Sequence, residues 1–302
     1  MLGHEFMGAS LLFTGDFVQA RTHFDKAIAL YDPVVHRSLA ARFGQDIAVS
    51  ILSYRSRTLW FLGYPEAALK DADDALKIAR EVGETATLMC SLGVTAVTQI
   101  ICGNYAAAAA QAHRLTTEAE QKGSLYWKAL GMMEQGSLLV LTGKAAKAVQ
   151  MLTTEIAAWR STRSTLYMPL YLSYLARAYV ELGQFEEASR RVVEAMTGAE
   201  IAKERWCQAD IHRTAGEFAL MLPEPDAAKA EAHFQQALTI AREQKAKSWE
   251  LRVATSIARL WRDQGKRQEA RDLLAPVYGW FTEGFDTRDL KEANALLDEL
   301  AN

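Results

Sequence analysis

The fold is decided by a stretch that recurs every 40 residues: GYPEAA at residues 63–68, GNYAAA at 103–108, GKAAKA at 143–148 and GQFEEA at 183–188. Each copy begins with a glycine and has an alanine five positions later, and the same pair recurs at Gly15 and Ala20 and at Gly265 and Ala270. A small residue also precedes each glycine by seven positions. A fixed period of this length predicts a stack of one supersecondary unit, which favours a scaffold that presents a surface over an enzyme.

One further copy lacks its glycine. Gly183 and Gly265 are 82 residues apart, which leaves room for one more repeat with two extra residues. Gly216 takes the position of the small residue in this copy and Ala230 that of the alanine, because they lie 40 residues from Ala176 and Ala270. The two extra residues fall in the turn 222–226. The sequence therefore predicts seven repeats.

Each repeat is predicted to be a pair of antiparallel helices. Apolar residues after Gly15 are spaced by three and four positions, as on one face of an amphipathic helix. Glycine accepts the left-handed conformation that ends a helix, so each recurring glycine marks the turn of a hairpin. A helix over 287–301, apolar on one side, is expected to cap the stack. The predicted repeats cover about 1–31, 32–83, 84–123, 124–163, 164–203, 204–245 and 246–285, within one solenoid domain spanning 1–302.

The first helix has no comparable cap. Its apolar residues Leu2, Phe6, Leu11 and Leu12 would need a neighbour to cover them. We therefore expect the chain to be cut from something longer.

Composition excludes several classes of protein. At 302 residues the chain exceeds the usual limit of one globular core, which a solenoid avoids because each repeat packs only on its neighbours. The net charge of −3 gives no reason to expect nucleic acid as a partner. No run of 18 apolar residues predicts a membrane span, and no signal peptide is present at the N-terminus. Three unpaired cysteines, Cys90, Cys102 and Cys207, favour reduced thiols in the cytoplasm.

The repeat resembles the tetratricopeptide repeat. An aromatic residue two positions after the glycine (Phe17, Tyr105, Phe185) and an alanine twelve positions after it are part of that pattern. The 40-residue period is longer than the usual 34. It looks like the variant found in bacterial signalling proteins such as the maltose-regulator and Rap-type families. The expected fold is all-α, a right-handed α-solenoid of seven tetratricopeptide-like hairpins with a C-terminal capping helix.

A closer resemblance covers essentially the whole chain. The segments 30–46, 246–252 and 278–290 are similar to the C-terminal repeat region of bacterial multidomain ATPases that often begin with an adenylate/guanylate cyclase domain. The resemblance implies a sensory or interaction module. These residues supply neither cyclase nor ATPase chemistry.

No catalytic, cofactor or metal motif stands out. The sequence has no phosphate-binding Gly-x-x-x-x-Gly-Lys-Ser/Thr, no Gly-x-Ser-x-Gly and no His-Glu-x-x-His. Asp32, His36 and Asp46 could in principle gather around a metal ion. The favoured interpretation is that Asp32 caps a helix that starts at Pro33 and that His36 is a partly exposed polar residue. We therefore predict no catalytic residues, no metal site and no cofactor.

The aromatic cluster near the C-terminus has a structural interpretation. Trp280, Phe281 and Phe285 lie just before the predicted capping helix. We expect them to form the core under that helix rather than a cage for a ligand.

The tetratricopeptide resemblance places a ligand groove on the concave face, which the first helix of each repeat lines. The middle of this groove is predicted to be apolar, and its C-terminal half carries arginines, whose planar donors suit carboxylates. The alternative is that these arginines form ion pairs with Asp210, Glu217 or Glu250, or are simply solvated. The predicted groove residues are Arg57, Trp60, Val97, Met133, Val140, Ser173, Arg177, Arg213, Arg252 and Arg259.

The expected function is a non-catalytic scaffold that binds a protein or peptide, with an acidic ligand favoured, in bacterial signalling. The alternative is an intramolecular arm that senses a small ligand and controls N-terminal ATPase or cyclase domains. Whether the natural gene continues upstream of Met1 separates the two. Nucleic acid and membranes are not expected partners.

Overall fold

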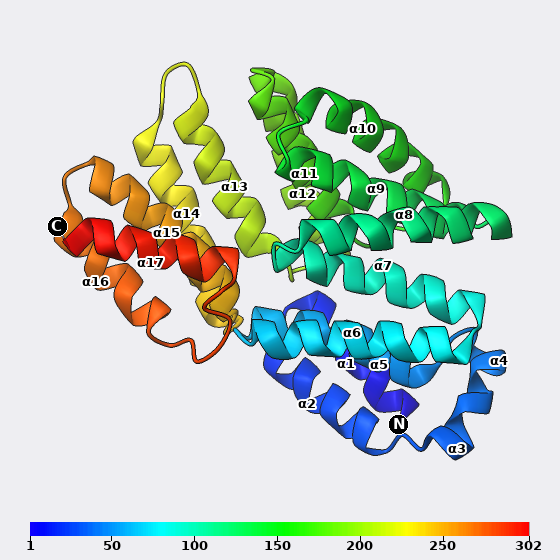
Figure 1. Ribbon diagram of the computed structural model, residues 1–302. Helices are drawn as coiled ribbons and strands as arrows, with labels where there is room; N and C mark the ends of the chain where they lie inside the picture. The colour runs from blue at the N-terminus through cyan, green and yellow to red at the C-terminus, as the bar shows by residue number, and fades with distance from the viewer. Residues whose placement is uncertain (302) are drawn as a thin grey trace.

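The computed structural model describes residues 1–301 and builds them from paired helices (Figure 1). Asn302, the last residue of the predicted domain, lies outside the described residues. The helices are α1 (Leu2–Thr14), α2 (Phe17–Ala29), α3 (Pro33–His36), the 3-10 helix η1 (Arg37–Leu39), α4 (Ala40–Phe43), α5 (Ile47–Phe61), α6 (Pro65–Val82), α7 (Thr85–Ile101), α8 (Tyr105–Lys122), α9 (Leu125–Leu141), α10 (Ala145–Ser161), α11 (Met168–Glu181), α12 (Phe185–Ala202), α13 (Gln208–Met221), α14 (Ala227–Glu243), α15 (Lys247–Asp263), α16 (Arg267–Tyr278) and α17 (Arg288–Ala301).

The predicted all-α solenoid is confirmed. Its seven hairpins are α1/α2, α5/α6, α7/α8, α9/α10, α11/α12, α13/α14 and α15/α16, and α17 follows as the terminal helix. The recurring glycines that end the first helices have positive φ, between 70° at Gly183 and 90° at Gly63. Glycine is needed there because other residues adopt this conformation only with strain.

The small residues of the repeat allow the two helices of a hairpin to approach closely. A Cβ atom added at Gly136 would lie 2.7 Å from Leu152, and one added at Gly216 would lie 2.5 Å from Phe234. Both distances are shorter than a Cβ contact tolerates. The small residues of the repeat therefore lie where the two helices of a hairpin contact each other.

The segment between α2 and α5 is built from helix caps. The Asp32 carboxylate accepts a hydrogen bond from the Val34 N–H at 2.9 Å, and Pro33 begins α3, as predicted. Asp46 is fully buried and caps α5, and it also accepts a hydrogen bond from the Tyr31 hydroxyl at 3.0 Å. The His36 ring accepts from the Asp32 N–H at 2.9 Å. Within the described residues, no three His, Cys, Asp or Glu side chains are grouped as a metal site would require.

The superhelix is so tight that repeats five apart in sequence touch each other. The turn of the first repeat meets the sixth, because the Arg205 N–H donates to the Phe13 carbonyl at 2.8 Å. The turn of the second repeat meets the seventh, where the Ser248 hydroxyl donates to the Trp60 carbonyl. The third and seventh repeats, four apart, also meet, since Arg252 of α15 donates to the Ile101 carbonyl at the end of α7 at 2.6 Å. Figure 1 shows this closure where the start of α6 approaches the segment that precedes α17.

An aromatic core fills the space inside this closed turn. The rings of Trp60 and Trp249 are 4.8 Å apart between centroids and those of Phe61 and Trp206 are 5.8 Å apart. All four side chains are buried. Tightly packed aromatic pairs contribute stability beyond the area that they bury. The interior at this level is therefore a packed core, not an open channel.

The expectation for the C-terminal aromatic cluster is right for one residue only. Phe281 is buried in the core under α17 with Leu290 and Val277. Trp280 instead lies against the second repeat, with its ring centroid 5.8 Å from that of Tyr64, and Phe285 is exposed. The expectation failed for these two residues because the closure between distant repeats gives Trp280 a different neighbour.

The apolar residues of the first helix are covered to different degrees. Leu12 is fully buried, Leu2 and Leu11 are half-buried, and Phe6 is 56% exposed. The sixth repeat supplies part of the cover, since the rings of Phe13 and Trp206 meet edge to face.

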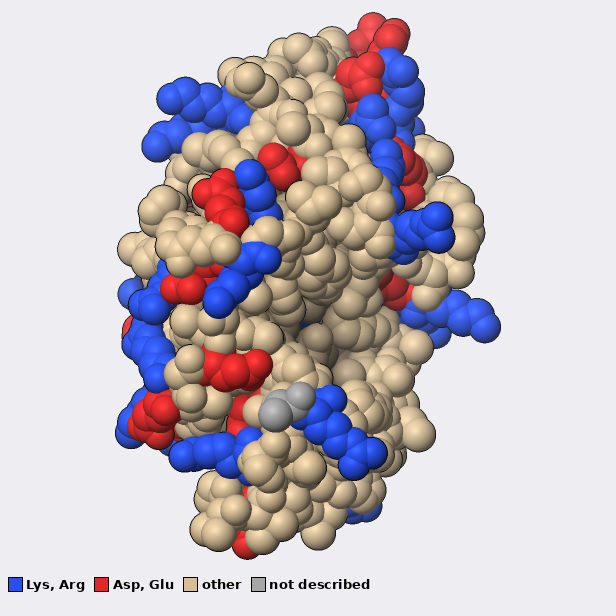
Figure 2. Space-filling view, turned by 90° about the vertical axis from the view of Figure 1, so that its right-hand side faces the viewer, with Lys and Arg blue, Asp and Glu red and all other residues tan. Residues whose placement is uncertain are grey.

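Charge is mixed on the face that includes the ends of α6, α7 and α8. Figure 2 shows Lys and Arg interleaved with Asp and Glu along both edges of this face and a largely uncharged, hollowed middle. This face therefore carries no continuous basic patch. Among the described helices, none is both long and apolar enough to cross a membrane.

Candidate functional site

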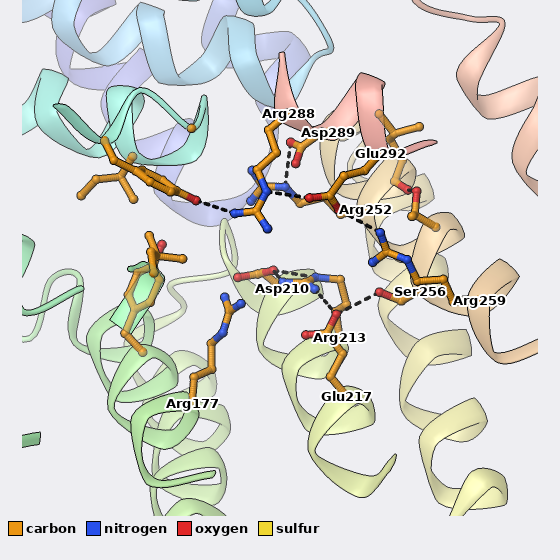
Figure 3. A pocket seen from close by; sticks show the side chains of 17 residues that line it. Arg177, Asp210, Arg213, Glu217, Arg252, Ser256, Arg259, Arg288, Asp289 and Glu292 are labelled. Carbon is orange, nitrogen blue, oxygen red and sulfur yellow. Dashed lines mark hydrogen bonds and ion pairs between the residues drawn. The ribbon is translucent and has the colours of Figure 1, made fainter. Parts of the chain in front are cut away.

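A cavity of about 280 Å³ opens on the concave side of the C-terminal half (Figure 3). Its walls come from α11, α13, α15, α17 and the turn after α7. The first helices of successive repeats point one side toward the superhelix axis, so their side chains converge there. The charged side chains that line the cavity are Arg177, Asp210, Arg213, Glu217, Arg252, Arg259, Arg288, Asp289 and Glu292.

On α13, Arg213 is held by two carboxylates of its own helix. It pairs with Asp210, three residues earlier, at 2.6 Å and with Glu217, four residues later. The Ser256 hydroxyl of α15 donates a further hydrogen bond to Glu217 at 3.1 Å. The predicted alternative of an ion pair with Asp210 and Glu217 is therefore confirmed for Arg213.

These charges fix the protonation of the α13 pair. Burial opposes ionisation of Asp210, but the positive charges of Arg213, Arg252 and Arg177 outweigh it and lower its pKa. Burial acts against the charge of Arg213 as well, and Asp210 and Glu217 more than compensate, so its pKa is raised. Both groups are ionised throughout the physiological range, and the pair forms a fixed dipole in the cavity wall.

On α15, the arginines pair with the terminal helix. Arg252 pairs with Asp289 at 2.8 Å and stacks on the ring of Trp60, with 4.8 Å between the guanidinium carbon and the ring centroid. Arg259 pairs with Glu292 at 2.9 Å. Glu250, the third predicted acidic partner, instead pairs with Arg242 and Lys247 on the other side of α15.

The terminal helix contributes site residues that the sequence did not indicate. Arg288 pairs with Glu292 at 2.6 Å and donates to the Tyr105 hydroxyl at 2.9 Å. The spacing of 288, 289 and 292 places them on one polar side of α17. A capping helix is expected to turn its polar side to water, and no pattern in the sequence shows that this side meets α15 and the end of α7.

Arg177 is the exception in the cavity. It lies on α11, is half-buried, and makes no hydrogen bond or ion pair with any residue that the structure describes. Figure 3 shows its side chain pointing into the cavity toward Asp210 with no interaction drawn to it. Five arginines face four carboxylates in this lining, so one positive charge is in excess. The excess charge is at Arg177.

The structure brings together four of the ten predicted groove residues. Arg177, Arg213, Arg252 and Arg259 all line the cavity. The other six are in the closed interior rather than on an open groove: Arg57, Trp60, Val97, Met133, Val140 and Ser173, each 0–3% exposed. Trp60, for example, is covered because the second repeat closes against the seventh, where its ring centroid is 4.8 Å from that of Trp249. Whether any of the ten residues contacts a ligand stays a prediction.

A polar centre lies inside the closed part of the superhelix. Arg57 is fully buried, donates to the Tyr167 hydroxyl at 3.2 Å and the Val94 carbonyl at 3.1 Å, and lies over the rings of Tyr167 and Trp206. Glu134 is also fully buried, and neither carboxyl oxygen has a hydrogen-bond partner among the described residues. Burial raises the pKa of Glu134 well above its ordinary value, because the charged form is disfavoured away from water.

Comparison with known proteins identifies the class of this fold. The model of the tetratricopeptide repeat matches residues 1–26 and 169–193, so the predicted resemblance is confirmed for these stretches. Among the curated proteins, none matches the chain. Several solved structures match the fold over more than nine tenths of the chain.

Three of these structures are Rap proteins. The apo form of RapI is 14% identical with a TM-score of 0.58, and the match covers 99% of this chain and 98% of that one. A Rap protein in complex with Competence and Sporulation Factor is 14% identical with a TM-score of 0.65, covering 98% and 75%. The Rap conjugation gene regulator of plasmid pLS20 in complex with the Phr* peptide is 15% identical with a TM-score of 0.63, covering 99% and 73%.

At this identity the likeness shows the fold: a tetratricopeptide-like solenoid of the kind found in Rap proteins. It agrees with the predicted resemblance to the Rap-type variant. None of these three structures is a cyclase-associated repeat region, so that finer resemblance stays a proposal.

Proposed function

We propose that the chain is a non-catalytic module of bacterial signalling that binds a peptide or a protein segment in the cavity between α11, α13, α15 and α17. The observation that carries the proposal is the guanidinium of Arg177, which makes no hydrogen bond or ion pair among the described residues, in a cavity whose other charges are paired. An unpaired, half-buried cation favours an anionic partner, and its planar donors suit a carboxylate.

The ionisation state of the carboxylates that line the cavity favours a binding site over a catalytic one. A general base must have a free lone pair and a pKa near the working pH. The pKa of Asp210 is lowered by its arginine neighbours, and Glu292, whose pKa burial would raise, has it lowered by Arg259 and Arg288 instead. Both carboxylates are thus fixed as anions in ion pairs, which suits a rigid wall for recognition.

The choice of a peptide as ligand rests on the relatives. Two Rap structures of the same fold were solved with bound ligands, one with Competence and Sporulation Factor and one with the Phr* peptide. A concave cavity with one excess charge is compatible with such a ligand here. The three cysteines are free and buried, which is compatible with a place in the reducing cytoplasm.

The test is selection from a pooled library of short peptides, followed by titration of the selected peptides. Arg177→Glu is expected to lower their affinity at least about tenfold, because it replaces the attracting charge with a repelling one. Arg271→Glu is the matched control, since Arg271 is exposed and lies outside the cavity. Recovery of no peptide above background, or equal affinity of Arg177→Glu and the parent, would refute the proposal.

A second candidate is a regulatory arm that controls an ATPase or cyclase domain. It is favoured by Val34 and Val35, which are 91% and 60% exposed in the segment 30–46 that resembles such proteins. An exposed apolar pair is suited to contact another domain. The test is whether the same gene encodes an ATPase or cyclase domain, and whether Val34→Asp with Val35→Asp changes the activity of that domain. Unchanged activity would exclude this candidate.

A further inference from the structure

A second cavity lies beside the first and shares a wall with it. It has a volume of about 120 Å³ and lies between α11, α12 and α13. Arg177 and Glu217 line both cavities. A ligand group bound to Arg177 is therefore next to both.

The two cavities differ in chemistry. The first is lined largely by charged side chains, whereas the second is lined mainly by Ala176, Val180, Val192, Phe218 and Met221. Val192 is buried, and Met221 is 53% exposed. An aliphatic group placed there would cover apolar surface that water now contacts, which is favourable.

The charges that line the first cavity indicate how many negative charges a bound ligand group should carry. In the first cavity one positive charge is in excess, at Arg177, which matches a single carboxylate. Glu181 in the second cavity adds one negative charge, which disfavours a second anionic group on the ligand. A phosphate group would bring up to about two negative charges and leave one uncompensated. Glu217, the other shared residue, is already engaged by Arg213 and Ser256.

We propose that the module recognises the C-terminal residue of a peptide, with the free carboxylate on Arg177 and an aliphatic side chain in the second cavity, between α11, α12 and α13. This inference rests on the proposed function and specifies its ligand.

The shared wall favours a C-terminal residue over an internal acidic one. In a C-terminal residue the carboxylate and the side chain are attached to the same Cα atom, so the two groups reach adjacent cavities together. In an extended peptide, the side chains that flank an internal Asp or Glu point to the opposite face. Glu181, which also lines the second cavity, disfavours an acidic side chain there.

The experiment uses hexapeptide libraries whose last residue is fixed as Leu, Val, Asp or Lys, each made with a free carboxylate and with a C-terminal amide. Affinity selection on the full chain is expected to enrich Leu- and Val-terminated free acids. Amidation of an enriched peptide is expected to lower its affinity about tenfold. In Arg177→Gln the acid and the amide are expected to bind equally.

Two exposed apolar residues give a matched pair for the second cavity. Met221→Glu is expected to remove the preference for an aliphatic last residue, because it places a charge at the cavity. Ile201→Glu is the control, since Ile201 is 79% exposed and lies outside both cavities. Loss of the preference in both variants would overturn the proposed place of the side chain.

The outcomes separate this inference from the proposed function. If peptides bind but the parent does not distinguish acid from amide, the inference is wrong and the proposed function stands. If no peptide binds, both fail. Free leucine, titrated as a competitor, tests whether the bound carboxylate belongs to the end of a peptide or to a small aliphatic molecule. Displacement of the peptide by leucine at equal concentration would show a small aliphatic carboxylate as the ligand and overturn recognition of a peptide terminus.

Discussion

Glu66 and Glu283, 217 residues apart in the sequence, form reciprocal contacts across the closure of the superhelix. The Glu283 carboxylate accepts hydrogen bonds from the backbone N–H groups of Glu66 at 2.9 Å and Ala67 at 3.1 Å. The Glu66 carboxylate in turn accepts from the Gly284 N–H at 2.7 Å. The N-cap residue of α6, Tyr64, makes no side-chain cap of its own. The cap of this helix is therefore supplied by the far end of the chain.

Removal of this remote cap should weaken the closure. Glu283→Ala leaves two N–H groups at the start of α6 without their acceptor, and loss of an N-cap costs about 0.5–2 kcal/mol. We expect a decrease of that size in the free energy of unfolding, measured by urea denaturation. Glu224→Ala, in the exposed turn before α14, should change it little. Equal stability of the two variants would contradict the capping role.

A pair of turn glycines tests the packing at the same closure. Gly63 and Gly143 both have positive φ, so alanine is strained at either position. A Cβ atom at Gly63 would also lie 2.4 Å from Trp280, whereas nothing is within 4 Å of one at Gly143. Gly63→Ala should therefore lower the free energy of unfolding by about 1–3 kcal/mol more than Gly143→Ala does. Similar losses would show that Trp280 moves aside without cost.

The contrast between these glycines shows what the sequence could predict. Both turns were predictable because a hairpin is encoded within one repeat, by its glycine and its small residues. The contact of Gly63 with Trp280 depends on the pitch of the superhelix. The pitch is the sum of small rotations between successive repeats, and no single repeat encodes it. The closure of the superhelix was therefore not predictable from the sequence. Six of the predicted groove residues are buried in its interior and do not line an open groove.

Four of the five arginines that line the cavity were predictable for the same local reason, and Arg288 of α17 was not. Arg177 and Arg259 occupy the same place in their repeats, six residues before the turn glycine, so they point toward the same axis. Their partners were predictable only within a helix, as for Arg213 with Asp210 and Glu217. The pairing of Arg259 with Glu292 depends on how α17 packs and could not be predicted.

Alanine substitutions at two helical glycines distinguish the effect of close packing from that of helix propensity. A Cβ atom at Gly216 would lie 2.5 Å from Phe234, but at Gly198 its nearest neighbour is Pro169 at 4.0 Å. Alanine is favoured over glycine inside a helix by about 0.5–1 kcal/mol. We expect Gly198→Ala to raise the melting temperature and Gly216→Ala to lower it. Stabilisation by both substitutions would contradict the role of Gly216 in the close approach of α13 and α14.

The pH dependence of stability should report on Glu204, which is buried in the turn between α12 and α13. Its carboxylate accepts hydrogen bonds from the Trp206 indole N–H at 2.6 Å and the Tyr167 backbone N–H at 2.9 Å. Burial outweighs these bonds and raises the pKa of Glu204 to about 7 from its ordinary value of 4.5. Its contribution to stability is therefore complete below pH 4.5 and is lost as the pH rises through 7.

Glu204→Gln should remove this part of the pH dependence. Glutamine does not ionise, and its carbonyl oxygen can accept the same two hydrogen bonds. Its amide group places donors where one carboxyl oxygen now has no partner among the described residues, but that cost does not vary with pH. Between pH 5 and pH 7 the parent should lose stability relative to Glu204→Gln by on the order of 1 kcal/mol per pH unit. Urea denaturation at several pH values measures this difference. The control is Glu200→Gln, at an exposed position.

The free energy of unfolding of this control should change with pH as that of the parent does. If the free energy of unfolding of Glu204→Gln also changed with pH as that of the parent does, Glu204 would ionise in the folded chain as easily as in the unfolded one.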